Sequence, residues 1–320
     1  MRTVALEEHF WTLAIAEAAG QRNPSAGPGS ELEADLADLG ERRLAAMDAA
    51  GIEVQVISHT TPGVQTLDAV TAVPLARRAN DHLAAAVGEH PDRFAGLATL
   101  PTPDPAAAAD ELERAVGELG LLGAMVNGHT EGRFLDDPAF DGILERAERL
   151  DVPLYLHPTE PVPAVRSAYY EGLSDQVTWM LSAAAWGWHA ETGLHVLRMI
   201  FGGVFDRHPG LKLVIGHMGE MLPFMLDRVD DQLPPAASGL ARLPSEYVRE
   251  HLWVTTSGLF SVPPLLCALE VLGAERVLFS VDWPYADNAA GRRLLDEAPL
   301  ADSDLERLAH GNADRLLGLG

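Results

Sequence analysis

Apolar residues along the chain follow two alternating patterns. Short runs rich in Val, Ile and Leu are typical of buried strands, and longer segments between them carry apolar residues at helical spacing. Eight strand-like runs occur in this alternation. They are Thr3–Leu6, Glu53–Ser58, Phe94–Ala98, Ala124–Val126, Val152–Leu156, Lys212–Gly216, Trp253–Thr256 and Val277–Val281.

Helix-like segments lie between these runs. Asp104-Pro105 and Asp137-Pro138 provide a capping side chain and a first-turn proline where two helices begin. Gly51, Gly120 and Gly273 follow helical stretches, where a left-handed residue is favoured. The predicted helices include Leu32–Ala50, Leu67–Gly88, Pro105–Leu119, Pro138–Leu150, Leu194–Phe205, Val262–Leu272 and Ser303–Leu317.

This repeated β/α alternation predicts an α/β fold, a (β/α)₈ or TIM barrel, with residues 1–320 as a single domain. A doubly wound parallel sheet is the alternative, but no G-x-G-x-x-G motif follows a strand-like run. No linker, repeat or low-complexity tract divides the chain. Two Gly- and Pro-rich stretches, Gly20–Ser30 and Pro234–Pro244, are predicted to be excursions from the barrel.

The net charge of −24 argues against nucleic acid or an anionic membrane surface as a partner. No apolar run approaches the roughly 18 residues that a membrane span needs. The N-terminal residues lack the basic and apolar regions of a secretory leader, and Cys267 is the only cysteine. We therefore expect a cytoplasmic protein without disulfide bonds.

The first strand-like run ends in two carboxylates and an imidazole. Side chains alternate between the faces of a strand, so Glu7 and His9 are expected on one face and Glu8 on the other. A carboxylate beside an imidazole can form half of a divalent metal site. Other predicted strands also end in polar residues, and active sites of such barrels lie at these C-terminal ends. These residues are Asn127, His157, His217 and Asp282.

Such a Glu, His and Asp set offers mixed nitrogen and oxygen donors, which suit Zn²⁺ or Mn²⁺. Each residue also has an ordinary interpretation, because a histidine after a strand is often a hydrogen-bonded loop residue and an aspartate often caps a helix. Asn127 before Gly128 is compatible with a turn, Glu220 with a helix N-terminal acid, and Arg228 with a surface ion pair. The recurrence in barrel order favours a metal site.

Several motifs of this chain resemble those of the amidohydrolase-related decarboxylases. The resemblance is closest to the γ-resorcylate (2,6-dihydroxybenzoate) and 2,3-dihydroxybenzoate decarboxylases, and more distant to aminocarboxymuconate-semialdehyde decarboxylase. It runs nearly end to end and closes with Gly311-Asn312-Ala313. The motifs are Leu6-Glu7-Glu8-His9-Phe10, Leu156-His157-Pro158, Gly203-Val204-Phe205-Asp206-Arg207, Gly216-His217-Met218-Gly219-Glu220, Thr255-Thr256-Ser257-Gly258 and Ser280-Val281-Asp282-Trp283-Pro284-Tyr285.

By this resemblance, Glu7, His9, His157 and Asp282 are ligands of one divalent metal ion, Zn²⁺ or Mn²⁺. His217 matches the family's catalytic histidine, which a carboxylate orients. The resemblance implies that Glu220 is this carboxylate. It also implies that the substrate contacts come from Asn127, Arg228 and Tyr285. In some relatives the arginine reaches the site across a subunit interface, and a homodimer or homotetramer is expected.

The residues themselves argue against a two-metal site. Many relatives carry His-x-His after the first strand and a carboxylated lysine that bridges two metals, whereas this chain has Glu7 in that pair. Its only lysine, Lys212, is expected at the start of a strand, far from the C-terminal face. Three functions remain open: a decarboxylase of a dihydroxybenzoate or salicylate type acid, a mononuclear metal-dependent hydrolase of a lactone or amide (or a hydratase), and a non-catalytic barrel that binds a ligand.

For the decarboxylase, the metal is expected to bind the carboxylate and the adjacent phenolic oxygen of the substrate. Direct C–C cleavage would leave an aryl carbanion, so the ring carbon should be protonated first. Asp282 is the expected acid, with a pKa raised by burial and by Glu7, and His217 supports that proton. Ala286-Asp287 and the absence of an aromatic residue from Gly20–Ser30 depart from the family and leave the preferred ring substitution open.

Overall fold

The computed structural model describes residues 1–20 and 29–319. Every paired strand runs parallel to its neighbours. The strands form one sheet in the order β1-β2-β3 and a second in the order β4-β5-β6-β7-β8-β9. The bounds are β1 Val4–Phe10, β2 Val54–His59, β3 Phe94–Gly96, β4 Ala98–Thr99, β5 Ala124–Asn127, β6 Pro153–His157, β7 Lys212–Ile215, β8 Leu252–Thr255 and β9 Val277–Leu278.

Two junctions close these sheets into a barrel. β3 and β4 are one strand interrupted at Leu97, whose N–H donates to Ile57 O at 2.9 Å. At the other junction Leu6 N–H donates to Phe279 O at 3.2 Å, so β1 meets the strand that continues from β9. Among the described residues the result is an eight-stranded parallel barrel, and the predicted fold class is confirmed.

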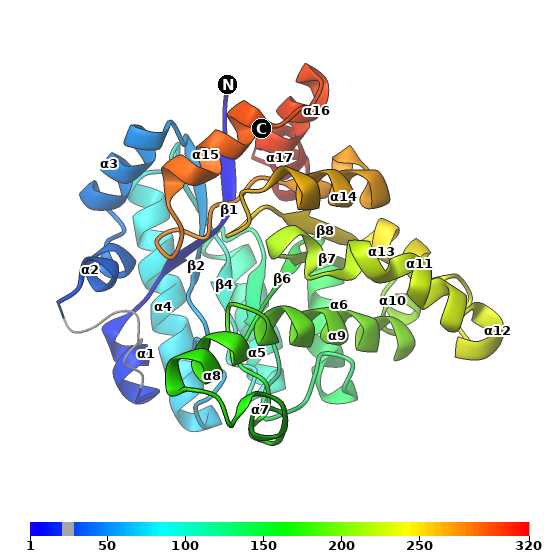
Figure 1. Cartoon of the computed structure of the whole chain (residues 1–320). Coiled ribbons are helices and arrows are strands. Elements are labelled where there is room, and N and C mark those ends of the chain that lie inside the picture. The colour runs from blue at the N-terminus through cyan, green and yellow to red at the C-terminus, as the bar shows by residue number, and fades with distance from the viewer. Residues whose placement is uncertain (21–28, 320) are drawn as a thin grey trace.

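Helices surround the barrel, and α7 and α8 lie at the end away from both termini (Figure 1). Asp104 and Asp137 cap their segments as predicted, each accepting a backbone N–H. The bounds are α1 Leu13–Ala18, α2 Glu31–Ala37, α3 Glu41–Ala50, α4 Ala69–Glu89, α5 Pro105–Gly117, α6 Asp141–Leu150, α7 Pro163–Tyr170, α8 Asp175–Ser182, α9 Gly187–Phe201, α10 Val204–Arg207, α11 Leu222–Gln232, α12 Pro235–Ser238, α13 Pro244–His251, α14 Val262–Leu272, α15 Asn288–Glu297, α16 Asp302–Glu306 and α17 Asn312–Leu317.

The structure corrects some of the predicted boundaries. The single helix expected over Leu32–Ala50 is two helices, because the Asp38 carboxylate accepts the N–H groups of Gly40 and Arg43 and starts α3 afresh. The excursion expected at Pro234–Pro244 contains α12. The loop predicted over Gly20–Ser30 lies largely outside the described residues, since 21–28 are not described.

The lower barrel interior is apolar. Leu6, Val56, Met125 and Tyr155 pack there as one buried cluster, which the side chains of α17 join from the N-terminal end of the strands. The polar strand-end residues therefore have only the opposite, C-terminal end in which to gather. Among the described residues, no helix combines the length and apolar character needed to cross a bilayer.

Candidate metal and active site

Four side chains converge at the C-terminal end of the barrel. Glu7 and His9 come from β1, His157 ends β6, and Asp282 follows β9. One ligand atom from each lies within 4.8 Å of the others. His157 Nε2 is 3.2 Å from Glu7 Oε1, and His9 Nε2 is 3.0 Å from Asp282 Oδ1. The structure thus brings together the four residues that the sequence analysis singled out as ligands.

Unsatisfied polar atoms mark this cluster as suited to a cation. Glu7 Oε1 and His9 Nε2 are buried and make no hydrogen bond of normal geometry with any described residue. Buried polar atoms of native proteins nearly always have a hydrogen-bond partner. Two unpaired atoms in the same cluster, Glu7 Oε1 and His9 Nε2, therefore indicate a shared partner such as a cation. Two carboxylates and two imidazoles are the donors that Zn²⁺ and Mn²⁺ accept, and the set fits one divalent ion.

The second oxygen of Glu7 is fully engaged by hydroxyl groups. Tyr155 donates a hydrogen bond to Glu7 Oε2, Ser257 Oγ donates at 2.5 Å, and Thr255 Oγ1 lies 3.4 Å away. Burial opposes ionisation of Glu7, but His217, His157 and His9 outweigh it and hold the pKa of this carboxyl well below its ordinary value. Glu7 is therefore an ionised carboxylate with one oxygen anchored and the other presented to the cluster.

Glu8 points to the other face of β1, as predicted. Its carboxyl group accepts the backbone N–H groups of Val281 at 2.9 Å and Trp283 at 3.1 Å, the two neighbours of Asp282. Asp282 itself has a left-handed φ of +76°, a conformation that costs a non-glycine residue on the order of 1–2 kcal/mol. Burial raises the pKa of Glu8 to about 8. Glu8 thus fixes the strained backbone that carries Asp282.

His217 lies beside the four-residue cluster and is held from behind. Its Nδ1 is 2.8 Å from Glu220 Oε1, while its Nε2 is 4.0 Å from Glu7 Oε1 and 3.9 Å from Asp282 Oδ2. Burial alone would lower the pKa of His217, but Glu220 and Glu7 raise it well above its ordinary value. The predicted pairing of His217 with Glu220 is present in the structure.

The expectation that Asp282 is protonated through a raised pKa is wrong. Burial and Glu7 do raise the pKa of Asp282, but the contacts with His217 and His9 outweigh them, and the net pKa is below its ordinary value. Asp282 and Glu7 in turn raise the pKa of His9 to about 9 against the opposing effect of burial. Contacts with the two imidazoles, which the sequence does not reveal, thus reverse the direction expected from burial and the neighbouring carboxylate.

A cavity of about 570 Å³ opens directly onto the cluster. The ring of Tyr285 lies 5.7 Å from that of His9, and its hydroxyl is 2.7 Å from Thr60 Oγ1. No lysine or arginine of the described chain lines this cavity. The lining comprises Trp11, Gly20, Thr60, Thr61, Pro62, Thr66, His157, Thr159, Glu160, Trp179, Met180, Ala183, Ala184, Trp188, Asp282 and Tyr285.

The two other predicted substrate-binding residues differ in position. Asn127 is buried beside His157 in the β5–β6 register, and its Oδ1 makes no hydrogen bond with a described residue. Arg228 is exposed on α11 and does not line the cavity of its own chain. The structure therefore brings Asn127 near the site and leaves Arg228 outside it.

Three kinds of site residue were missing from the sequence analysis. Tyr155 lies inside an apolar strand and looks like a core residue. Trp188, with Trp179 and Met180, forms a cavity wall from α8 and α9, which lie far along the sequence from the end of β6. His189 Nδ1 lies 2.6 Å from Glu220 Oε2, a contact that no sequence spacing signals.

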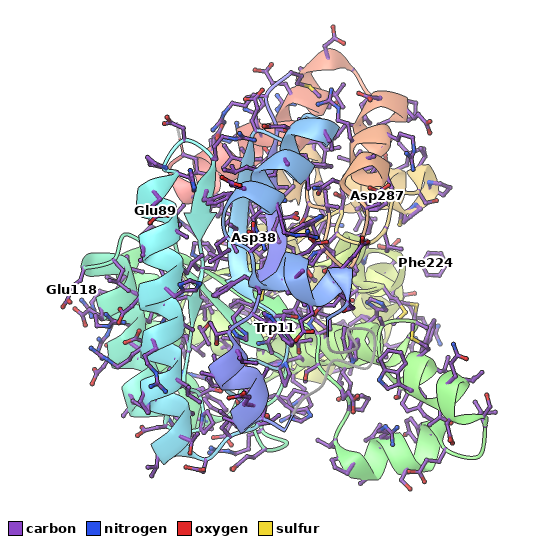
Figure 2. The ribbon with its side chains drawn as sticks, turned by 90° about the vertical axis from the view of Figure 1, so that its left-hand side faces the viewer. Trp11, Asp38, Glu89, Glu118, Phe224 and Asp287 are labelled. Carbon is purple, nitrogen blue, oxygen red and sulfur yellow. The ribbon has the colours of Figure 1, made fainter. Side chains whose placement is uncertain are left out.

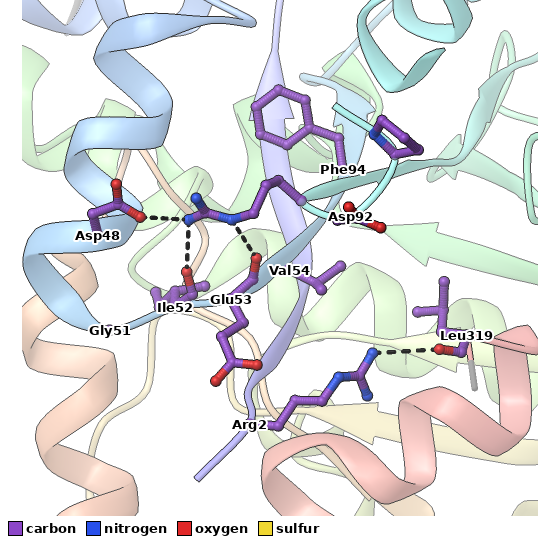
Figure 3. Close-up of a pocket in the computed structure, with 11 residues that line it drawn as sticks. Arg2, Asp48, Gly51, Ile52, Glu53, Val54, Asp92, Phe94 and Leu319 are labelled. Carbon is purple, nitrogen blue, oxygen red and sulfur yellow. Dashed lines mark hydrogen bonds and ion pairs between the residues drawn. The ribbon is translucent and has the colours of Figure 1, made fainter. Parts of the chain in front are cut away.

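A second cavity, of about 670 Å³, lies near the N-terminal ends of the strands (Figure 3). Its arginines are already bound: Arg93 donates to Asp48 and to the carbonyls of Ile52 and Glu53, and Arg2 donates to Leu319 O (Figure 3). None of the four ligand-type residues lines this cavity. This cavity and the four-residue cluster therefore lie at opposite ends of the barrel.

The barrel and the four-residue cluster at its C-terminal end together identify the class of protein. The chain belongs to the amidohydrolase family, whose model matches residues 9–319.

Particular relatives are decarboxylases. The chain is 41% identical over 336 residues to a gamma-resorcylate decarboxylase of Rhodococcus jostii, covering 99% of this chain and 98% of the relative. It resembles a crystal structure of 2,6-dihydroxybenzoate decarboxylase complexed with 2,6-dihydroxybenzoate, with a TM-score of 0.91, 38% identity and coverage of 100% and 99%. A dihydroxybenzoic acid decarboxylase from Polaromonas with bound manganese and the inhibitor 2-nitroresorcinol has a TM-score of 0.90 and 37% identity, with coverage of 99% and 97%.

Proposed function

We propose that this protein is a metal-dependent, non-oxidative decarboxylase of hydroxylated aromatic acids, of the dihydroxybenzoate or salicylate type, which releases CO₂ and a phenol. The observation that carries the proposal is that Glu7 Oε1 and His9 Nε2 are buried without a partner, in a cluster whose His157 and Asp282 line an aromatic-walled cavity. The similarity to 2,6-dihydroxybenzoate decarboxylases over the whole chain supports the same reaction class.

Glu7, His9, His157 and Asp282 would hold one divalent ion, Mn²⁺ or Zn²⁺. Bound there, the ion supplies positive charge for the carboxylate and the adjacent phenolic oxygen of the substrate. That charge is needed because no lysine or arginine of the described residues lines the cavity. The manganese in the Polaromonas decarboxylase supports Mn²⁺ as the first ion to test.

The ring carbon that bears the carboxylate must gain a proton before the C–C bond breaks. The raised pKa of His217 and the lowered pKa of Asp282 favour a resting site in which the proton sits on the imidazole. The proton then moves from this His217–Asp282 pair to the carbon, CO₂ leaves with the bond electrons returning to the ring, and solvent restores the proton. Glu220 stabilises the charged imidazole and fixes its orientation.

The cavity walls suit a flat aromatic acid. Trp11, Trp188 and Tyr285 offer apolar faces, while Thr60 and Thr159 offer hydroxyl partners for ring substituents. Asn127 Oδ1, buried without a described partner, is available to accept from a phenolic hydroxyl.

The test is incubation of the metal-analysed protein with a panel of salicylates and dihydroxybenzoates, following phenol and CO₂ in equal amounts. We expect one equivalent of Mn²⁺ or Zn²⁺ per chain and activity that disappears with a chelator and returns with the ion. Hydrolysis of lactones or amides without any release of CO₂ would overturn the proposal in favour of a mononuclear hydrolase.

We further propose that the chain forms a homodimer or homotetramer through the face that carries α11. Phe224 is 82% exposed, and in Figure 2 its ring projects away from the body of the protein. Met221 and Met225, at the start of the same helix, are also exposed, an apolar set unusual for a free surface. Arg228 lies one helical turn beyond Phe224 on the same face, which supports delivery of this arginine to a neighbouring subunit.

Light scattering on a Phe224→Asp variant tests the interface. We expect it to dissociate, whereas the matched control Val70→Asp, at an equally exposed apolar position on α4, leaves the assembly unchanged. An unaltered mass for Phe224→Asp would rule out this face.

A further inference from the structure

Glu220 is shared by two imidazoles. Its Oε1 lies 2.8 Å from His217 Nδ1 and its Oε2 lies 2.6 Å from His189 Nδ1, and Glu220 is 1% exposed. The two rings stand edge to face with centroids 4.7 Å apart. Each oxygen of the Glu220 carboxylate therefore has its own imidazole partner. Oε1 contacts His217, which lies beside the four-residue cluster, and Oε2 contacts His189.

The segment that carries His217 and Glu220 cannot hold its shape through backbone preference. Residues 217–221 all have left-handed φ values, from +50° at His217 to +89° at Gly219. Left-handed backbone costs on the order of 1–2 kcal/mol for each non-glycine residue. Such strain persists only where surrounding contacts fix it, and the two imidazole–carboxylate contacts are such contacts.

His189 also touches the cavity wall. Its Nε2 lies 2.8 Å from the carbonyl oxygen of Ala184, which lines the cavity, and its neighbour Trp188 lines it as well. The joint between α8 and α9 is tight, because a Cβ on Gly187 would lie 2.2 Å from Ser182 O. The His189 ring thus connects Ala184 in the cavity wall to the Glu220 carboxylate that holds His217.

We propose that His189 is a positioning residue that aims Glu220 at His217 Nδ1 and so presents His217 Nε2 to the substrate. The kinetic consequences of this inference rest on the proposed function, whereas the role of His189 in orienting Glu220 does not depend on it. An ionised Glu220 only accepts hydrogen bonds, so the proton of His217 must lie on Nδ1 when that ring is neutral. Without His189, Oε2 loses its donor and the carboxylate is free to turn away.

Two amide variants separate the contacts of His189. In His189→Asn the amide occupies the Nδ1 position and keeps a donor for Glu220, whereas in His189→Gln it occupies the Nε2 position and keeps only the contact with Ala184. We expect His189→Asn to retain kcat within about threefold. His189→Gln and His189→Leu should both lose about tenfold to hundredfold in kcat with little change in KM, as is usual for partners that orient a reacting group.

Two comparisons guard against a purely structural role. In a Glu220→Gln background, His189→Leu should cause no further loss of kcat. His251→Leu is the matched control, because His251 is a buried histidine whose Nδ1 bonds a backbone carbonyl away from the cavity. It should lower the melting temperature and leave kcat unchanged. The proposal is overturned if His189→Gln retains activity and His189→Asn does not, or if loss of activity simply follows loss of stability.

A readout independent of turnover completes the test. With ¹⁵N-labelled histidine, NMR at a pH high enough for the His217 ring to be neutral should show His217 as the Nδ1–H tautomer in the wild type and in His189→Asn, and a mixture of tautomers in His189→Gln. If the wild type decarboxylates nothing, the proposed function fails, yet this comparison still decides the role of His189. An Nδ1–H tautomer that is the same in all variants would refute the inference.

Discussion

Tyr155→Phe is the most direct test of how the chain prepares Glu7. The hydroxyl of Tyr155 donates to Glu7 Oε2, and the side chain is 1% exposed within β6. Phenylalanine keeps the ring and its packing, so the change removes the hydrogen bond to Glu7 Oε2 and the 3.0 Å contact of the same hydroxyl with Thr255 Oγ1. Ser257 and Thr255 remain as the other hydroxyl neighbours of that oxygen.

The expected magnitude comes from two independent estimates. A hydrogen bond to a charged group contributes about 1.5–3 kcal/mol. Loss of a partner that orients a metal ligand usually weakens metal affinity by about 10–100-fold, which is about 1.4–2.8 kcal/mol. Both estimates predict that the Kd for Mn²⁺ rises by one to two orders of magnitude.

Titration of Mn²⁺ followed by calorimetry measures this Kd. Tyr247→Phe is the matched control, because Tyr247 is equally buried and its hydroxyl donates to the Asp206 carboxylate at 2.7 Å, on the outer layer of the barrel. It should lose comparable stability and bind Mn²⁺ normally. The reasoning fails if Tyr155→Phe binds Mn²⁺ as tightly as the wild type, or if both variants weaken binding equally.

Four further outcomes are expected. Gly216→Ala should weaken Mn²⁺ binding by at least about tenfold in the same titration, because its Cβ would lie 2.6 Å from Glu7 Oε2. His9 must lose a proton to bind a metal, and its pKa is about 9, so Mn²⁺ affinity should rise about tenfold per pH unit between pH 7 and 8.5; a flat profile would contradict this. His195 is buried with a pKa lowered to about 3 by burial, and its Nε2 accepts a backbone N–H, so only the unfolded chain gains its proton below pH 6.5. Urea unfolding should therefore show wild-type stability falling by about 2 kcal/mol relative to His195→Gln between pH 7 and pH 5, and parallel curves would refute it. Asp282→Asn should keep its circular dichroism spectrum and lose at least about 100-fold in decarboxylation, and wild-type turnover would exclude Asp282 from the proton pair.

The strands were predictable because parallel barrel strands are buried on both faces and appear as short apolar runs. All eight predicted runs overlap an observed strand, including Val277–Val281, where only Val277–Leu278 pairs as a strand. The helix α8 was missed, because Trp179 and Met180 face the cavity rather than the core and its apolar pattern is therefore weak.

The convergence of the ligand-type residues was predictable for a related reason. The C-terminal ends of barrel strands meet, so polar residues that end separate strands are brought together. Tyr155 and His189 carried no such signal, because one lies within an apolar run and the other on a helix. The pKa of Asp282 was predicted in the wrong direction, since its sign depends on contacts with two imidazoles that only the folded chain defines.

The closure of the barrel by the first and last strands has a consequence for biogenesis. Glu8 and Trp283, which are bonded to each other, stand 275 positions apart in the chain. A ribosome that has released the β1 segment must therefore add the 275 residues that separate Glu8 from Trp283 before the matching amides emerge. Until Asp282 emerges, the growing polypeptide carries only three of the four ligand-type side chains, so the proposed cation could be held by all four only after that point. Contacts of such sequence separation also slow folding.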